Sequence, residues 1–185
     1  MKRIFIALKV EPGDTLLRMM SSLKSLLGNE RINWVDPANI HLTLAFLGDT
    51  DEEMIKIADL AVRQQCRGSG EFSFKLSGTG VFRNYRDPKV IWAGIEECPN
   101  LTRLNNLIST ALCDAGFKLE KRPFKPHITL GRIKSIKDPK AFESAVERYR
   151  STFFQEVAVN EVILFESIIK PTGPVYKPLG KFMLA

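Results

Sequence analysis

The sequence predicts an α+β fold of two pseudo-symmetric lobes, each a mainly antiparallel sheet flanked by helices, with an active-site cleft between them. Helix-like and strand-like segments are interspersed, but without the regular alternation that parallel sheets require. Two similar strand-like segments, residues 40–44 and 126–130, each follow one predicted helix and precede another. This repeat indicates an internal duplication, and no low-complexity linker separates its halves. We therefore expect residues 1–185 to form a single bilobal domain.

Four segments combine the apolar spacing of amphipathic helices with residues that begin or end helices. The first covers residues 14–27. Thr50 and the glutamate three residues later fit a capping box, which opens the second helix. The third starts at Pro99, and the fourth has Asp138 as its N-cap and Pro139 as its first helical residue.

Strand-like runs, rich in β-branched and aromatic residues, lie between these helices. They cover residues 3–10, 40–47, 72–82, 90–95, 127–133 and 155–165. A looser alternation at residues 175–184 predicts a last strand. Because the strands are not linked by a steady series of crossover helices, we expect antiparallel pairing.

The composition is typical of a globular protein, with 44% apolar and 26% charged residues. A net charge of +6 favours anionic partners, including nucleic acid. The apolar run near residue 5 is too short for a secretory signal or a membrane span, so we expect a cytoplasmic protein without membrane association. The three cysteines are far apart and form no C-x-x-C pair, which argues against a disulfide framework or a thiolate metal site.

The two histidines of the chain occur in the same local pattern, His-x-Thr-Leu, at residues 41–44 and 127–130. At average composition, one histidine meets this pattern with a chance on the order of one in two hundred. Side chains in a strand alternate between faces, so His41 and Thr43 share a face about 7 Å apart, as do His127 and Thr129. The residues between them point into the core. If the two lobes face each other, the two pairs meet across the cleft.

Such a cleft suits a phosphodiester. One imidazole can take a proton from water while the other protonates the departing oxygen, because the histidine pKa lies near neutrality. The threonine hydroxyls can donate hydrogen bonds to the non-bridging phosphate oxygens. Phosphoryl transfer needs mainly positioning and charge stabilisation, which this arrangement supplies without a metal.

The sequence resembles the 2H phosphoesterases, and within them the RNA 2′,3′-cyclic phosphodiesterases, formerly called 2′–5′ RNA ligases. The segments that carry the resemblance are residues 3–7, 41–48, 124–132, 165–167 and 173–176. The resemblance implies a phosphoric diester hydrolase that opens an RNA-terminal 2′,3′-cyclic phosphate to a 2′-phosphomonoester. It implies no metal and no other cofactor, and its partners would be RNA ends or tRNA fragments bearing the cyclic phosphate. No obligate protein partner is expected.

The same resemblance implies a role for each motif residue. His41 would be the proton donor and His127 the proton acceptor that activates water, while Thr43 and Thr129 would hold the phosphate. The residues alone do not assign acid and base, because the two motifs are nearly symmetric.

A cation-rich segment, residues 118–140, surrounds the second motif and supplies weaker candidates for substrate binding. These candidates are Arg122, Phe124, Lys125 and Arg132. Cations can follow an RNA backbone and an exposed aromatic ring can stack on a base, but the segment is equally well read as a solvated surface with Phe124 in the core. Arg132 reaches the histidine face only if its strand bulges near Gly131. In a straight strand Phe46 would also point away from the histidine face, with Leu42 and Leu44, so we expect it in the core.

Alternative functions remain. The cleft could belong to a non-catalytic RNA-binding module, or to an RNA 2′–5′ ligase or a phosphodiesterase acting on another cyclic nucleotide. A metal protein built from histidines and cysteines has few available ligands.

Overall fold

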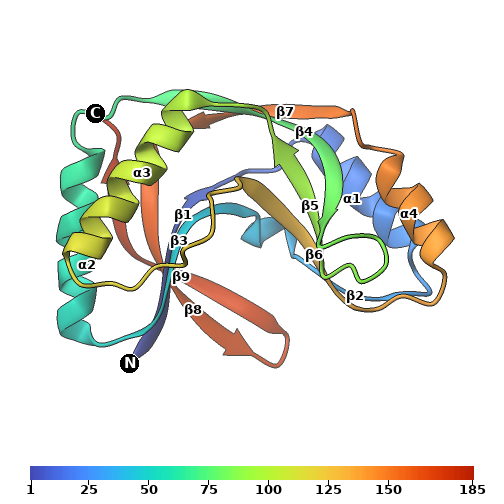
Figure 1. Cartoon of the computed structure of the whole chain (residues 1–185), viewed down its shortest axis with the longest axis horizontal. Coiled ribbons are helices and arrows are strands. Elements are labelled where there is room, and N and C mark those ends of the chain that lie inside the picture. The colour runs from blue at the N-terminus through green and yellow to red at the C-terminus, as the bar shows by residue number, and fades with distance from the viewer.

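The computed structural model describes residues 1–185 and contains two antiparallel sheets (Figure 1). The first sheet has four strands in the order β3-β1-β8-β9. Their bounds are His41–Thr50 for β3, Lys2–Lys9 for β1, Glu161–Lys170 for β8 and Gly173–Met183 for β9. The β8–β9 hairpin projects beyond the rest of the sheet, as Figure 1 shows.

The second sheet has five strands in the order β2-β6-β5-β4-β7. Their bounds are Arg31–Trp34 for β2, His127–Ser135 for β6, Val90–Ile95 for β5, Phe72–Phe82 for β4 and Phe153–Val159 for β7. Every pairing in both sheets is antiparallel. The predicted α+β class with antiparallel sheets is confirmed.

Each sheet carries two helices, and the chain exchanges segments between the lobes. Helices α2 (Glu52–Cys66) and α3 (Pro99–Asp114) contact each other and pack on the first sheet. Helices α1 (Asp14–Leu26) and α4 (Pro139–Glu147) pack on the second (Figure 1). The helix that precedes each motif strand in the sequence therefore packs on the opposite lobe. None of these helices combines the length and apolarity that a membrane crossing needs.

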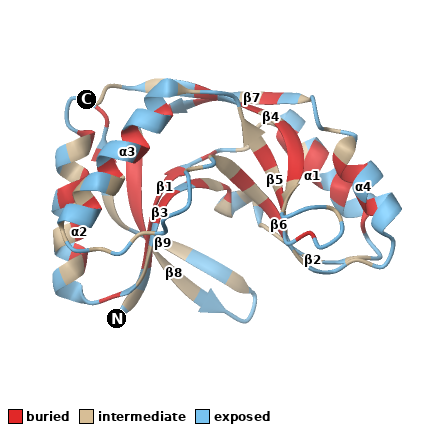
Figure 2. Cartoon of the chain, viewed as in Figure 1, coloured by how far each residue is buried: buried red, intermediate tan, exposed pale blue.

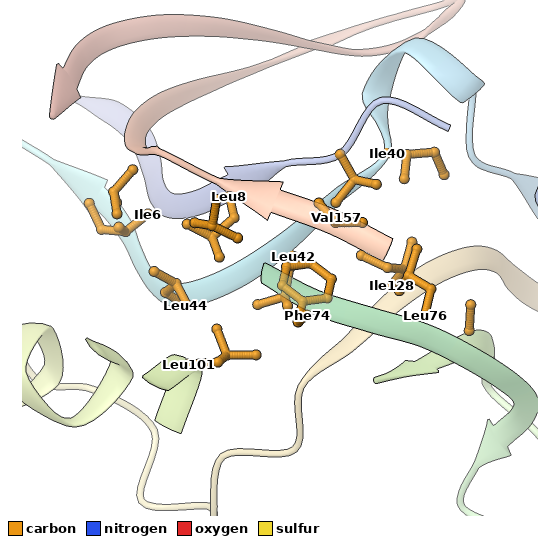
Figure 3. Packing of buried hydrophobic residues seen from close by; sticks show 14 of the residues in the cluster. Ile6, Leu8, Ile40, Leu42, Leu44, Phe74, Leu76, Leu101, Ile128 and Val157 are labelled. Carbon is orange, nitrogen blue, oxygen red and sulfur yellow. The ribbon is translucent and has the colours of Figure 1, made fainter. Parts of the chain in front are cut away.

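One contiguous hydrophobic core of 38 buried residues extends through both lobes. The buried residues are distributed over the helices and strands of both lobes (Figure 2). Leu42 and Ile128, the middle residues of the two motifs, are both fully buried in this core (Figure 3). Burial of these side chains fixes which face of each strand its histidine and threonine occupy.

The structure corrects three sequence-based expectations. Residues 155–165 are not one strand, because the chain breaks at Asn160 between β7 and β8, which belong to different sheets. The N-cap of α2 is Asp51, whose carboxylate accepts from the Met54 N–H at 2.8 Å, whereas the Thr50 hydroxyl donates to the Gly48 carbonyl. Strand β2 was also missed: its four residues alternate polar and apolar, but the run is at the lower limit of length for a strand signal.

Candidate active site

The two motif strands lie where the sheets meet. Strand β3 is an edge strand of the first sheet, and it contacts β6 of the second sheet. His41 and His127 are the first residues of these strands. The fold therefore brings the two motifs, which are remote in sequence, into one region.

A β-bulge follows the threonine of the first motif. Along β1 and β3, Ala7 pairs with Thr43 and Ile6 pairs with Ala45, so Leu44 is the extra residue. Because a bulge shifts the alternation by one residue, Phe46 shares the face of His41 and Thr43. The expectation that Phe46 packs in the core is wrong: its side chain is 48% exposed.

The second motif has a bulge at the same place. Trp92 of β5 pairs with Thr129 and Ile91 pairs with Gly131, so Leu130 is the extra residue. The shift puts Arg132 on the face of His127 and Thr129. The strand therefore bulges next to Gly131, as the sequence analysis required for Arg132 to reach this face. Gly131 is needed at this bulge, because a Cβ there would lie 2.8 Å from Cγ2 of Ile32 and 3.1 Å from the Trp34 ring.

Both bulged residues keep a partner for their carbonyl. The buried side chain of Asn105 in α3 donates from Nδ2 to the Leu44 carbonyl at 2.9 Å. The backbone N–H of Val35 donates to the Leu130 carbonyl, also at 2.9 Å. A buried carbonyl without a partner is destabilising, so these two hydrogen bonds hold the bulges in place.

The two imidazole rings are oriented in the same way. Nδ1 of His41 lies 2.6 Å from the Asn39 carbonyl, and Nδ1 of His127 lies 2.7 Å from the Lys125 carbonyl. A carbonyl only accepts, so each Nδ1 carries a proton and the Nε2 of each neutral ring is left free to accept one. The Asn39 side chain donates from Nδ2 to the Pro174 carbonyl at 3.0 Å. This hydrogen bond connects Asn39, whose carbonyl orients the His41 ring, to strand β9.

Aromatic side chains surround each histidine on its own sheet. The His41 ring lies 5.1 Å from the Phe5 ring and 5.1 Å, edge-on, from the Tyr176 ring. Phe5 belongs to a second, small apolar cluster with Ala7, Ile163 and Phe165, and it contacts the His41 ring. The His127 ring packs edge-on against Phe82 at 4.6 Å.

Burial lowers the pKa of both histidines from the ordinary histidine value. The hydrogen bonds to the Asn39 and Lys125 carbonyls oppose this shift, and the charge of Arg132 adds to it at both rings. The charge of His127 also lowers the pKa of His41. The structure thus places His41, His127 and Arg132 within electrostatic reach of one another.

Two cavities flank the histidines. A cavity of about 910 Å³ lies beside His127 and is lined by Phe82, Trp92 and Lys125, among others. A smaller cavity of about 400 Å³ lies beside His41 and is lined by Lys9, Asn39, Tyr176 and Lys181, among others. Each motif therefore adjoins its own space for part of a substrate.

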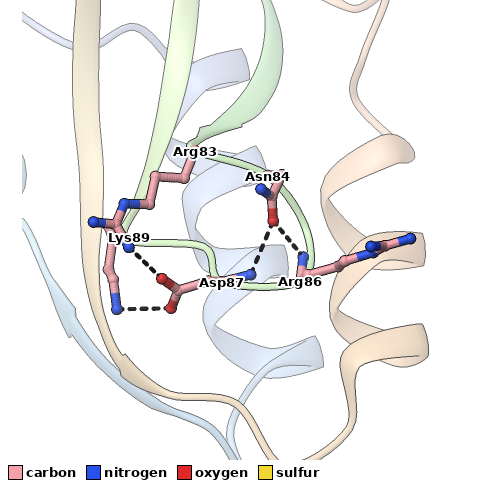
Figure 4. Close-up of polar contacts among 5 residues, drawn as sticks. All are labelled: Arg83, Asn84, Arg86, Asp87 and Lys89. Atoms are coloured by element: carbon pink, nitrogen blue, oxygen red, sulfur yellow. Dashed lines mark hydrogen bonds and ion pairs between the residues drawn. The ribbon is translucent and has the colours of Figure 1, made fainter.

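The weaker candidates have different placements. Lys125 is exposed and lines the larger cavity, and Phe124 lines it too while packing partly against the core. Arg122 is exposed and lines neither cavity. In the loop between β4 and β5, Asp87 forms ion pairs with Arg83 and Lys89 (Figure 4). The Asn84 side chain accepts hydrogen bonds from the backbone N–H groups of Arg86 and Asp87.

Several residues of the site could not be found from the sequence. Phe5 and Phe82 are ordinary apolar residues of strand-like runs, and Asn39 belongs to a short turn, η1 (Pro37–Asn39). Tyr176 lies in a segment that carried only the family resemblance. None of the four has a local sequence signal for function, because each reaches a histidine through tertiary packing. The structure contains no group of three or more His, Cys, Asp or Glu side chains that could hold a metal ion.

Comparisons with known proteins agree with this architecture. A family model described as LigT-like phosphoesterase matches residues 6–92 and 94–176, and each matched segment contains one histidine motif. The RNA 2′,3′-cyclic phosphodiesterase of Archaeoglobus fulgidus is 37% identical, covering 97% of this chain and 99% of that protein. The one of Methanothermobacter thermautotrophicus is 30% identical, covering 98% of both.

Solved structures match over the whole chain as well. The TT0787 protein of Thermus thermophilus aligns with a TM-score of 0.80 and 29% identity, covering 98% of this chain and 97% of that one. E. coli LigT complexed with 3′-AMP aligns with a TM-score of 0.74 and 25% identity, covering 100% of this chain and 98% of that one. These matches define an enzyme of the phosphoesterase class. Within that class, the chain belongs to the LigT-like phosphoesterase family.

Proposed function

We propose that this enzyme hydrolyses the 2′,3′-cyclic phosphate at the end of an RNA to a 2′-phosphomonoester, with His41 and His127 as acid and base. The observation that carries the proposal is the paired arrangement of the imidazoles. Both have Nδ1 fixed on a backbone carbonyl, and both lie within electrostatic reach of Arg132. Relatives named RNA 2′,3′-cyclic phosphodiesterase support the choice of substrate.

In the proposed reaction, water attacks phosphorus and the bond from phosphorus to the 3′ oxygen breaks. His127 takes the proton of the water at Nε2, and His41 donates a proton from Nε2 to the leaving 3′ oxygen. This assignment of acid and base follows the roles that the family resemblance implies. The negative charge of the bound phosphate favours the protonated form of His41, which burial disfavours in the free enzyme.

The remaining site residues position the phosphate. Thr43 and Thr129 share the faces of the two histidines, and their hydroxyls can donate to the non-bridging oxygens. Arg132 can form charge-assisted hydrogen bonds with the same oxygens, and Lys125 can contact the RNA backbone. The proposal also includes three further points. Residues 1–185 form a single domain, and the protein is cytoplasmic. The enzyme acts on tRNA fragments and needs neither a protein partner nor a metal.

The test is hydrolysis of a nucleoside 2′,3′-cyclic phosphate in the presence of EDTA. We expect turnover by the wild type to a 2′-phosphate product, and a loss of at least about a hundredfold in kcat for His127→Ala. Equal thermal unfolding midpoints would show that the variant is folded. Salt-dependent RNA binding without turnover of any cyclic phosphate would instead favour a non-catalytic RNA-binding module.

A further inference from the structure

Phe82, the last residue of β4, packs on the His127 imidazole. The two ring centroids lie 4.6 Å apart, and the ring planes are nearly perpendicular, at 88°. The other contact that orients the imidazole is the hydrogen bond from Nδ1 to the Lys125 carbonyl. The torsion that turns a histidine ring is broad, so one hydrogen bond at one edge does not fix the ring. Phe82 lies where it can limit this motion.

The next ring along the second sheet is that of Trp92 in β5. Its centroid lies 6.0 Å from that of Phe82. Trp92 is directly across from Thr129 in β6 and from Gly80 in β4, so it is on the histidine face of the sheet. Neither Phe82 nor Trp92 packs against the main hydrophobic core or the smaller apolar cluster. A role in the core therefore does not explain these two rings.

Two glycines make room for the Trp92 ring. A Cβ at Gly80 would lie 2.3 Å from Cζ2 of Trp92, and a Cβ at Gly94 would lie 3.2 Å from its Cζ3. The ring therefore lies against the backbone of β4. Its indole N–H is buried and has no acceptor in the protein, which is destabilising. Stability alone does not account for a tryptophan at this position.

The two halves of the chain differ at this place. In the first half, the residue across from the motif threonine is Ala7, which pairs on its other side with Ile163. In the second half, the corresponding residues are Trp92 and Gly80. The large and the small side chain have exchanged strands. The bulk is therefore on the strand next to the motif strand, where it lies beside Phe82.

We propose that Phe82 and Trp92 are positioning residues for His127. Phe82 limits the rotation of the imidazole, and Trp92, seated on Gly80, limits the movement of Phe82. Together with the hydrogen bond at Nδ1, they hold Nε2 in one place. An error of about 1 Å in the place of a reacting group can cost about a hundredfold in rate. The inference rests on the proposed function, because it takes His127 as a catalytic residue.

The first test is steady-state kinetics with a nucleoside 2′,3′-cyclic phosphate. We expect Phe82→Ala to lower kcat about ten- to a hundredfold with little change in KM, because the imidazole is misplaced while the phosphate contacts remain. Phe82→Leu keeps an apolar side chain of similar bulk, so it should recover most of the lost kcat. Phe153→Ala is the control, since Phe153 is exposed on β7 of the same sheet and should leave kcat unchanged.

A double variant tests whether Trp92 acts through Phe82. Trp92→Ala should lower kcat about three- to tenfold, and Phe82→Ala/Trp92→Ala should be hardly slower than Phe82→Ala. Losses that multiply in the double variant would contradict support of His127 by Trp92 through Phe82.

The second test needs no turnover, so its failure is separate from failure of the proposed function. The chain has two histidines, so long-range ¹H–¹⁵N spectra contain two sets of imidazole signals, which His127→Ala assigns. At a pH where both rings are neutral, we expect wild-type His127 to show one tautomer, with its proton on Nδ1. In Phe82→Ala its signals should broaden or report a mixture of tautomers, while those of His41 stay in place.

The outcomes separate positioning from general stability. Unchanged His127 signals in Phe82→Ala would overturn the inference, as would an unchanged kcat or equal changes at both histidines. If Phe82→Ala does not fold, the same comparison is made with Trp92→Phe, which keeps a ring but a smaller one. Freed His127 signals in the variant, with no turnover of any cyclic phosphate by the wild type, would remove the proposed function alone.

Discussion

Phe46 and Arg132 occupy equivalent positions in the two halves of the chain. Each is five residues after its motif histidine, and in each strand a bulge at the leucine of the motif moves it onto the histidine face. The duplicated backbone therefore presents an aromatic ring from the first lobe and a cation from the second. This difference breaks the near symmetry of the two motifs, and it gives the two histidine-bearing strand faces different chemistry.

The charge of Arg132 should contribute to the pH dependence of the enzyme, beside the larger effect of burial on the pKa of both histidines. Because this cation lowers the pKa of both histidines, its removal by Arg132→Gln makes protonation of both rings easier and raises both pKa values. We expect both limbs of the kcat/KM profile to move to higher pH, and kcat/KM to fall about ten- to a hundredfold as a phosphate contact is lost. The measurement is a pH–rate profile for a nucleoside 2′,3′-cyclic phosphate.

Arg67→Gln is the control for this profile, because Arg67 is an exposed arginine at the end of α2. It should leave both limbs in place. A profile of Arg132→Gln that stays at the wild-type pH, or moves to lower pH, would contradict the electrostatic link between Arg132 and the histidines.

The Asn39 side chain should act on the reaction by positioning His41. Its hydrogen bond to the Pro174 carbonyl holds the residue whose own carbonyl orients the imidazole. Loss of one such bond is worth about 0.5–1.5 kcal/mol, so Asn39→Ala should lower kcat about two- to tenfold with little change in KM. Steady-state kinetics with Asn100→Ala, at an exposed asparagine in the first turn of α3, gives the comparison. An effect confined to KM would rule out the positioning role.

The first bulge should depend on Asn105. Replacement by alanine leaves the buried Leu44 carbonyl without a partner, so Asn105→Ala should reduce the free energy of unfolding by about 1–3 kcal/mol. Asn106→Ala, one residue further along α3 and exposed, should change it by no more than about 0.5 kcal/mol. Urea unfolding of the two variants checks this difference, and equal stabilities would show that the hydrogen bond does not support the bulge.

The fold class was predictable because its signals are local. The helices at Pro99 and Asp138 begin where their capping residues predicted, and the strand limits at 72–82 and 90–95 agree with the structure. The limits at 155–165 failed because one apolar run supplies two strands, and the turn at Asn160 has no glycine or proline to mark it. The repeated motif predicted the family, which the comparisons confirm.

The side chains around the motifs were less accessible to sequence reasoning. Simple alternation placed Phe46 in the core, and it failed because no glycine stands beside Leu44 to mark the first bulge. For Arg132, the sequence predicted a place on the histidine face only if the strand bulged near Gly131. Tyr176 and Asn39 reach His41 through the β9 strand and the η1 turn, and contacts of this kind depend on the folded chain. The roles of the four motif residues stay a prediction.

The most direct test of the whole account is a double-mutant comparison of kcat for a nucleoside 2′,3′-cyclic phosphate. If His41 and His127 act together on one phosphorus, each single alanine variant should lose nearly all activity, and His41→Ala/His127→Ala should be hardly slower than either. Losses that multiply in the double variant, or a single variant that keeps wild-type turnover, would contradict joint action of the two imidazoles.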